Sequence, residues 1–150
     1  MQQIKHLLIG TFCVATFTGA AFADTRVAEI KTHAGLVKQA SENIGRLLKV
    51  KQPDAQGIRD GIGAMGLDIE KLQRLVVEIT EANPDFAVRG DEDWSRLKTQ
   101  VQLLGIFHNT KDGLMKADDM KKNRSLLQAH AKGLAVRSAS LQETATRLQR

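Results

Sequence analysis

The side chains of this 150-residue chain that could bind a cofactor are its histidines and methionines. Beyond residue 24, the histidines are His33, His108 and His130. Imidazole and thioether groups are common axial ligands of haem iron. Two such ligands must lie at one level on facing helices, because inward side chains reach only a few ångströms along a helix axis. The spacing predicts that His108 and His130 lie about 12 Å apart along the axis, at 1.5 Å per residue.

The histidines also have simpler interpretations. His33 and His130 each precede a small residue of an apolar stripe, which favours partly exposed positions at the edge of a helix interface. His108 lies in its stripe near the end of a predicted helix, where imidazole can cap a carbonyl or pack. No HExxH, Glu-x-x-His or Cys-x-x-Cys-His motif occurs, and the only cysteine is Cys13. We therefore expect no metal site, no covalent haem and no enzymatic activity.

A second unusual stretch contains four glycines, Gly57, Gly61, Gly63 and Gly66, within a helical pattern of isoleucines. Each glycine costs about 1 kcal/mol relative to alanine in a helix interior. The glycines would be explained by a close approach of the backbone to a ligand or partner helix, by a flexible segment that opens, or by small-residue packing. The Gly-x-Gly-x-x-Gly pattern within this stretch follows no strand, so it does not predict a dinucleotide site.

The first 23 residues are typical of a secretory signal peptide. Lys5 precedes an uncharged apolar stretch over 7–22, and Ala21-Phe22-Ala23 fits a cleavage site. Cys13 lies within this segment, and the bulky residue before it does not fit lipid attachment. No later stretch has the ~20 apolar residues that cross a bilayer. We therefore expect an exported periplasmic protein without a transmembrane anchor, whose domain spans residues 24–150.

Apolar residues recur at alternating steps of four and three along four segments, which predicts helices at about 25–50, 53–82, 92–112 and 118–149. A sustained repeat of 3.5 residues turns one face of each helix toward its neighbours. The predicted core residues are Val27, Ile30, Ala34, Val37, Ser41, Ile44, Leu48, Ala55, Ile58, Ile62, Met65, Ile69, Leu72, Val76, Ile79, Trp94, Leu97, Val101, Leu104, His108, Met120, Leu127, Ala131, Leu134, Ser138, Leu141, Ala145 and Leu148.

Turn signals between the segments predict an all-α, antiparallel up-down-up-down four-helix bundle. Asn83-Pro84 ends the second helix, Asp112-Gly113 ends the third, and Asp118-Asp119 begins the fourth. All connections are short except 83–90, so successive helices should lie antiparallel. Small residues alternate with large ones on the first and last helices. These small positions could receive the large side chains of the other helix and draw the two axes together, although ordinary variation in packing explains the pattern equally well.

Several of these features resemble the soluble periplasmic cytochromes b of the b-562 type. The resemblance rests on 56–65 (Gln-Gly-Ile-Arg-Asp-Gly-Ile-Gly-Ala-Met), the Asn83-Pro84 break, Asp93-Trp94 at the start of helix three and a basic last helix. It implies a four-helix bundle that holds haem b between a methionine early in helix one and a histidine late in helix four. Neither ligand is present here, because residues 25–50 contain no methionine and 141–150 no histidine.

Charge is unevenly distributed, with seven basic and three acidic residues in 117–150. Export and a scarcity of aromatic residues argue against nucleic acid as the partner. The leading hypothesis is a protein that binds a periplasmic or envelope protein or a peptide, with a homodimer also compatible. The candidate residues for partner binding are Lys121, Lys122, Arg124, Lys132, Arg137 and glycines 57, 61, 63 and 66.

Two alternatives remain open. The first is a haem-b electron carrier that uses one histidine and a methionine, with His33, Met65 and His130 as the candidate residues and Met115 or Met120 as further methionines. The second is a ligand-sensing or stress-chaperone bundle whose apolar seam opens. In the leading hypothesis, no cofactor is bound.

Overall fold

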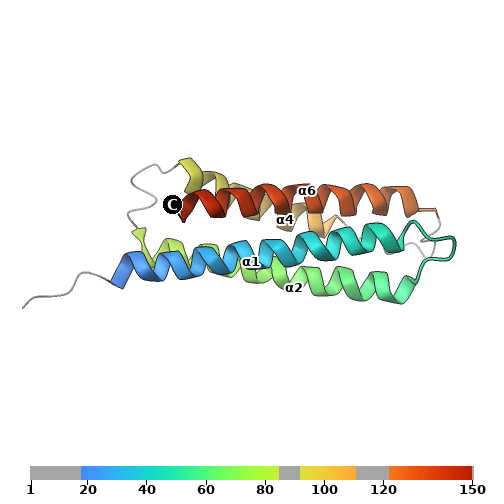
Figure 1. Ribbon diagram of the computed structural model, residues 1–150, viewed down its shortest axis with the longest axis horizontal. Helices are drawn as coiled ribbons and strands as arrows, with labels where there is room; N and C mark the ends of the chain where they lie inside the picture. Colours follow the sequence, from blue (N-terminus) through green and yellow to red (C-terminus); the bar gives the residue numbers. More distant parts are fainter. Residues whose placement is uncertain (1–17, 85–91, 111–121, 150) are drawn as a thin grey trace, which may run out of the picture.

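The computed structural model describes residues 18–84, 92–110 and 122–149, with side chains from residue 25 onward. These residues form four α-helices and contain no strand, which confirms the all-α class. The helices are α1 (Thr18–Leu47), α2 (Ala55–Ala82), α4 (Glu92–Asn109) and α6 (Arg124–Leu148), and Figure 1 shows them packed along a common direction.

Local side-chain chemistry explains where α2 and α4 begin and where α2 ends. The carboxylate of Asp54 accepts a hydrogen bond from the backbone N–H of Gly57 at 3.0 Å, so Asp54 caps α2. At the other end, the backbone N–H and side-chain amide of Asn83 both donate to the carbonyl of Ile79. Glu92 and Asp93 occupy the first turn of α4, where carboxylates interact favourably with the helix dipole. These ends agree with the sequence to within two residues.

The predicted boundaries around the last connection need correction. Helix α4 ends at Asn109 rather than Asp112, and α6 begins at Arg124 rather than Asp118. The first turn of α6 contains no acidic residue. The connection is therefore longer than the short turn that was expected, and the charge pattern at Asp118-Asp119 does not mark the start of α6. Helix α1 likewise begins at Thr18, before the expected position at Thr25.

The predicted apolar stripes coincide closely with the core. Every predicted stripe residue of α1 and α4 is buried, including the polar Ser41 and His108. In α2 the stripe shifts by one residue, because Leu75 is buried in place of Val76. Ala55 is exposed and Leu148 is half-buried, while Met120 lies outside the described residues. The core also contains His130 and Thr144, which the repeat did not predict.

Each helix packs against two others. Helix α1 contacts α2 and α6, and α4 contacts the same two helices. The C-terminal end of α6 lies beside the first turns of α1 (Figure 1). Hydrogen bonds agree with this orientation, since Gln142 donates to the carbonyl of Lys31 and Gln128 donates to the carbonyl of Leu48. The packing is compatible with the predicted up-down-up-down arrangement.

The register of α1 on α6 pairs small residues with large ones. The two glutamine hydrogen bonds place Ala34 at the level of Leu141 and Ser41 at the level of Leu134. All four side chains are fully buried. Because an alanine or serine leaves room for a leucine on the facing helix, the two backbones can approach closely. Among the four described helices, α1 and α6 form the most extensive contact.

This complementarity predicts a penalty for enlarging a small seam residue. The substitution Ala34→Leu should lower the free energy of unfolding by about 1–3 kcal/mol, because a leucine there meets a space already filled. The matched substitution Ala64→Leu places the same side chain on the exposed face of α2 and should change stability by less than about 0.5 kcal/mol. Urea unfolding followed by circular dichroism measures both. Equal effects of the two substitutions would contradict the tight α1–α6 seam.

Candidate functional site: a basic groove between α1 and α6

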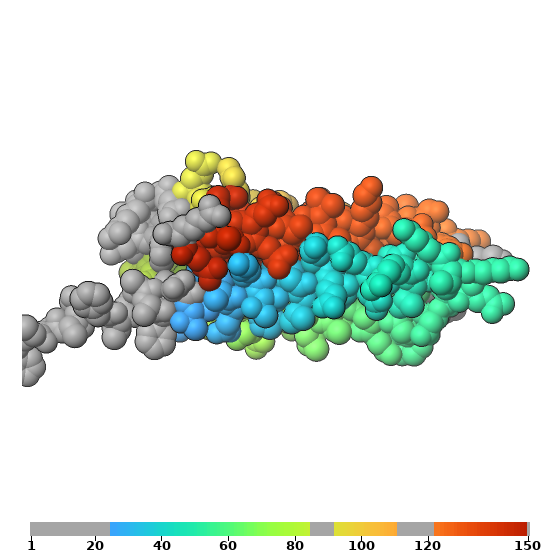
Figure 2. Space-filling model, in the orientation of Figure 1, coloured from blue at the N-terminus to red at the C-terminus, as the bar shows by residue number. Residues whose placement is uncertain are grey.

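A surface groove of about 1000 Å³ lies between α1 and α6. Figure 2 views the molecule from the side on which these two helices lie side by side. Small side chains on the two helices leave room for this groove, because they project little toward solvent. Its apolar lining comes from Gly45, Ala129, Ala131, Ala135 and Val136.

Gly45 is informative because no close contact within the described residues requires a glycine at this position. A Cβ atom added at Gly45 would meet no atom within 4 Å. Gly45 lies in the last turn of α1, which ends at Leu47, so the cost of glycine there is below the roughly 1 kcal/mol of a helix interior. No close contact offsets this cost among the described residues, so the glycine keeps part of the groove open without serving internal packing.

The polar rim of the groove is basic. Arg46, Lys49 and Lys132 line it and form no ion pair with a described carboxylate. The one acidic residue in the lining, Glu42, is paired with Lys38 at 3.5 Å. The groove therefore combines an apolar floor with an excess of positive charge, which is suited to an acidic, partly apolar binding partner.

The five predicted basic residues of the last helix do not form one face. Lys132 lines the α1–α6 groove, whereas Arg137 lies over the ring of Phe107 on α4, at 4.2 Å from the ring centroid. Arg124 donates to the carbonyls of Leu48 and Val50, so it ties the start of α6 to the segment that follows α1. Lys122 is exposed. Lys121 lies outside the described residues.

The four glycines of α2 have different surroundings. Gly57 lies against the capping carboxylate of Asp54, and a Cβ at Gly61 would lie 3.3 Å from Ile44 on α1. A Cβ at Gly66 would lie 3.0 Å from Nε2 of His108 on α4, whereas one at Gly63 would meet nothing within 4 Å. Gly61 and Gly66 therefore serve close packing of neighbouring helices. None of the four lines the α1–α6 groove.

A smaller hollow of about 300 Å³ lies between α2 and α4. It is lined by Gly63, Gly66 and Gly105 and by the polar side chains of Glu70, Gln73, His108 and Asn109. Three glycines at this contact leave space that larger residues would fill. The side chain of Gln73 already extends over Gly105, so the hollow is partly occupied by the protein itself.

The histidines occupy three distinct environments. Nδ1 of His33 lies 2.8 Å from the carboxylate of Asp68 on α2, so His33 is half-buried and joins α1 to α2. His130 stacks on Phe107 with ring centroids 4.8 Å apart, and it is only 6% exposed. The expectation that His130 is partly exposed is therefore wrong. Gly133 explains the burial, because its missing side chain leaves room for the Phe107 ring.

The predicted separation of His108 from His130 also needs correction. Phe107, the neighbour of His108, contacts His130, so the two imidazoles lie at nearly the same level of the fold. The short turn assumed for the last connection caused the error, because it aligned His108 with Lys122. His108 nevertheless faces α2 through Gly66, while His130 faces α4. Met65 is buried, and its sulfur accepts a hydrogen bond from Ser41 at 3.0 Å.

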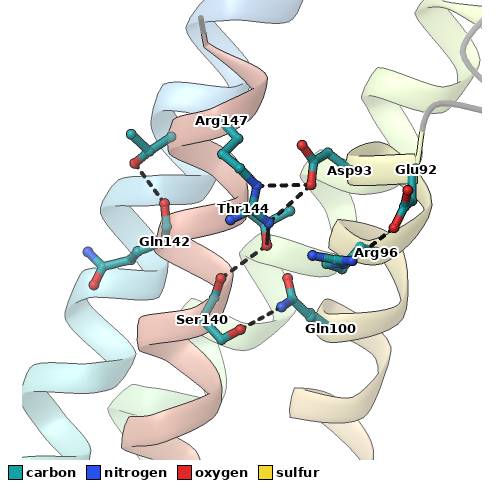
Figure 3. A network of polar contacts seen from close by, with 9 residues as sticks. Glu92, Asp93, Arg96, Gln100, Ser140, Gln142, Thr144 and Arg147 are labelled. Atoms are coloured by element: carbon teal, nitrogen blue, oxygen red, sulfur yellow. Dashed lines mark hydrogen bonds and ion pairs between the residues drawn. The ribbon is translucent and has the colours of Figure 1, made fainter.

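A polar network joins α4 to α6 away from the groove (Figure 3). Arg147 donates to Asp93 at 3.0 Å and to the hydroxyl of Thr144, and Gln100 donates to Ser140 at 2.8 Å. The Arg147–Asp93 and Gln100–Ser140 contacts cross the interface, so the network has a structural explanation. The network and the stacking of Phe107 on His130 both join α4 to α6, and they agree on how the two helices are aligned along their length.

Comparisons of the chain with protein-family models, with curated proteins and with solved structures give no significant match. Within the described parts of the chain, no helix has the length and apolar character needed to span a bilayer. In the same residues, no three His, Cys, Asp or Glu side chains gather as they would around a metal ion.

The α2 glycines generate a paired prediction about stability. Gly63→Ala should raise the free energy of unfolding by up to about 1 kcal/mol, since the added methyl group meets open space. Gly66→Ala should lose this gain, because the methyl group approaches the buried ring of His108. Thermal and urea unfolding of both variants measures the difference. An equal gain at the two positions would contradict the close contact of Gly66 with α4.

Proposed function

We propose that the chain is an exported, non-catalytic antiparallel four-helix bundle that binds a periplasmic or envelope protein through the groove between α1 and α6. The observation that carries this proposal is the combination of an apolar floor with three unneutralised cations, Arg46, Lys49 and Lys132. A groove that served only internal packing would need neither the open glycine at position 45 nor this excess of charge.

The chemistry of the groove favours an amphipathic helix with acidic flanks as the bound segment. Helices α1 and α6 form the two walls of the groove, and the small side chains between them can accept the apolar face of a third helix, as in other helix-in-groove interfaces. Ala129, Ala135 and Gly45 would allow the backbone of such a helix to approach closely. Carboxylates on its flanks would then lie near Lys49 on one side and Lys132 on the other, which fixes orientation and increases the association rate.

The proposal predicts that binding depends on the charge of the groove. The probe is a synthetic helical peptide with leucine and alanine on one face and glutamate along both flanks. The double variant Lys49→Glu, Lys132→Glu should weaken binding at least about 10-fold, because two attractions become repulsions. Isothermal titration calorimetry at low and high salt measures the affinity, which should fall as salt rises.

The matched control is the double variant Arg59→Glu, Lys98→Glu, which changes the net charge equally on α2 and α4, outside the groove. It should leave the affinity within about 2-fold of the unmodified chain, since screened charges at a distance contribute little. A peptide that does not bind, or one whose affinity falls equally in both double variants, would contradict a specific α1–α6 site.

A haem-b carrier is a second candidate, favoured by the burial of Met65, His108 and His130 in adjoining parts of the core. Gly66, next to Met65, contacts His108, and Phe107, next to His108, stacks on His130. Thioether and imidazole groups could supply axial ligands once the core rearranged to admit the macrocycle.

Titration of the chain with haem, followed by visible absorption, tests this candidate. A carrier should show the intense band of coordinated haem, and the band should shift or disappear in His130→Ala and Met65→Leu. The same spectrum in the two variants and the unmodified chain, or no spectral change on haem addition, would contradict coordination by these residues. Helicity measured on the same samples separates loss of a ligand from loss of the fold.

A further inference from the structure

A second surface, on the outer face of α2, carries a stripe that the core does not use. Its residues are Gly63, Leu67, Glu70, Arg74 and Val77, at alternating steps of four and three. All five are exposed, with Leu67 at 67% and Val77 at 53%. This spacing is the one that places side chains along a single helix face for contact with another helix.

The charged residues at the centre of the stripe are not paired within the described structure. Neither Glu70 nor Arg74 forms an ion pair with another described residue, although their spacing of four would allow one. A shallow depression of about 460 Å³ runs over this part of α2 and is lined by Glu70, Arg74 and Val77 among others. The stripe is therefore an open surface with apolar residues on both sides of an acid and a base.

The order of these residues is self-complementary under two-fold symmetry. If a second copy of α2 lies antiparallel, with the axis midway between Glu70 and Arg74, then Glu70 of each copy faces Arg74 of the other. In the same register, Leu67 of each copy faces Val77 of the other. A parallel arrangement would instead place Glu70 against Glu70 and Arg74 against Arg74. Isologous contact requires such a match between a surface and itself.

From this pattern we propose that the chain forms a two-fold symmetric homodimer through the outer face of α2. Two reciprocal ion pairs between Glu70 and Arg74 select the antiparallel register, and Leu67 and Val77 supply the buried apolar contact. The α1–α6 groove cannot serve as such an interface equally well, because its excess of cations would face the same cations in a second copy. The dimer is independent of the partner-binding groove and leaves it accessible.

Sedimentation equilibrium of the full chain tests the dimer. The unmodified chain should associate reversibly, and Arg74→Glu or Glu70→Arg should each weaken association at least about 10-fold, because like charges then face one another. An equimolar mixture of these two single variants should form a heterodimer, since one presents two acids and the other two bases. The double variant Glu70→Arg, Arg74→Glu exchanges the charges and should restore self-association.

Leu67→Lys provides a separate test of the apolar contact and should also weaken association, while Lys132→Glu in the groove should leave it unchanged. Circular dichroism of each variant confirms that the helices remain. A chain that is monomeric at all concentrations would overturn the proposal. So would a dimer that persists in Arg74→Glu and Leu67→Lys, or two single variants that fail to associate with each other when mixed.

Discussion

The fold depends above all on the fit between α1 and α6, where alanine and serine on one helix face leucine on the other. Ala34 lies at the level of Leu141 and Ser41 at the level of Leu134, all of them buried. This close approach aligns the first and last helices, which are the farthest apart in sequence, and thereby closes the arrangement of four helices. It also leaves small side chains along the outer edge of the contact, so the same feature that stabilises the core shapes the groove.

The remaining interfaces fix the register by polar contacts at the edge of the core. Between α1 and α2 the ion pairs Arg26–Glu78 and Glu29–Lys71 alternate in sign, and a hydrogen-bond contact between His33 and Asp68 follows them. Each partly exposed pair contributes at most about 1 kcal/mol. Their alternation matters more, because a shift of about one helical turn along the interface would bring like charges together. Between α4 and α6, the Arg147–Asp93 ion pair and the Gln100–Ser140 hydrogen bond also fix the register, because a shift would break both contacts.

The sequence was sufficient to predict the four helices and most of the core, because burial follows the repeat of four and three residues. It was insufficient where a helix end depends on tertiary contacts. Arg124 begins α6 by bonding to carbonyls in the segment that follows α1, which no local pattern indicates, so the assumed turn gave the wrong register for His108 and His130. The groove was missed because it combines Lys132 with Arg46 and Lys49, about 85 positions away in the chain. The glycine at position 133, which admits Phe107 beside His130, was the one available signal for burial of that histidine.

The pairing of α1 with α6 can be measured most directly by nuclear Overhauser effects between methyl groups in the full chain. The close seam predicts cross-peaks that join the methyl group of Ala34 to those of Leu141, and the methyl group of Ala145 to those of Ile30. A spectrum in which Ala34 instead shows contacts to Ala131, as a parallel arrangement of these helices would give, would contradict the seam, the groove that depends on it and the proposed site of partner binding.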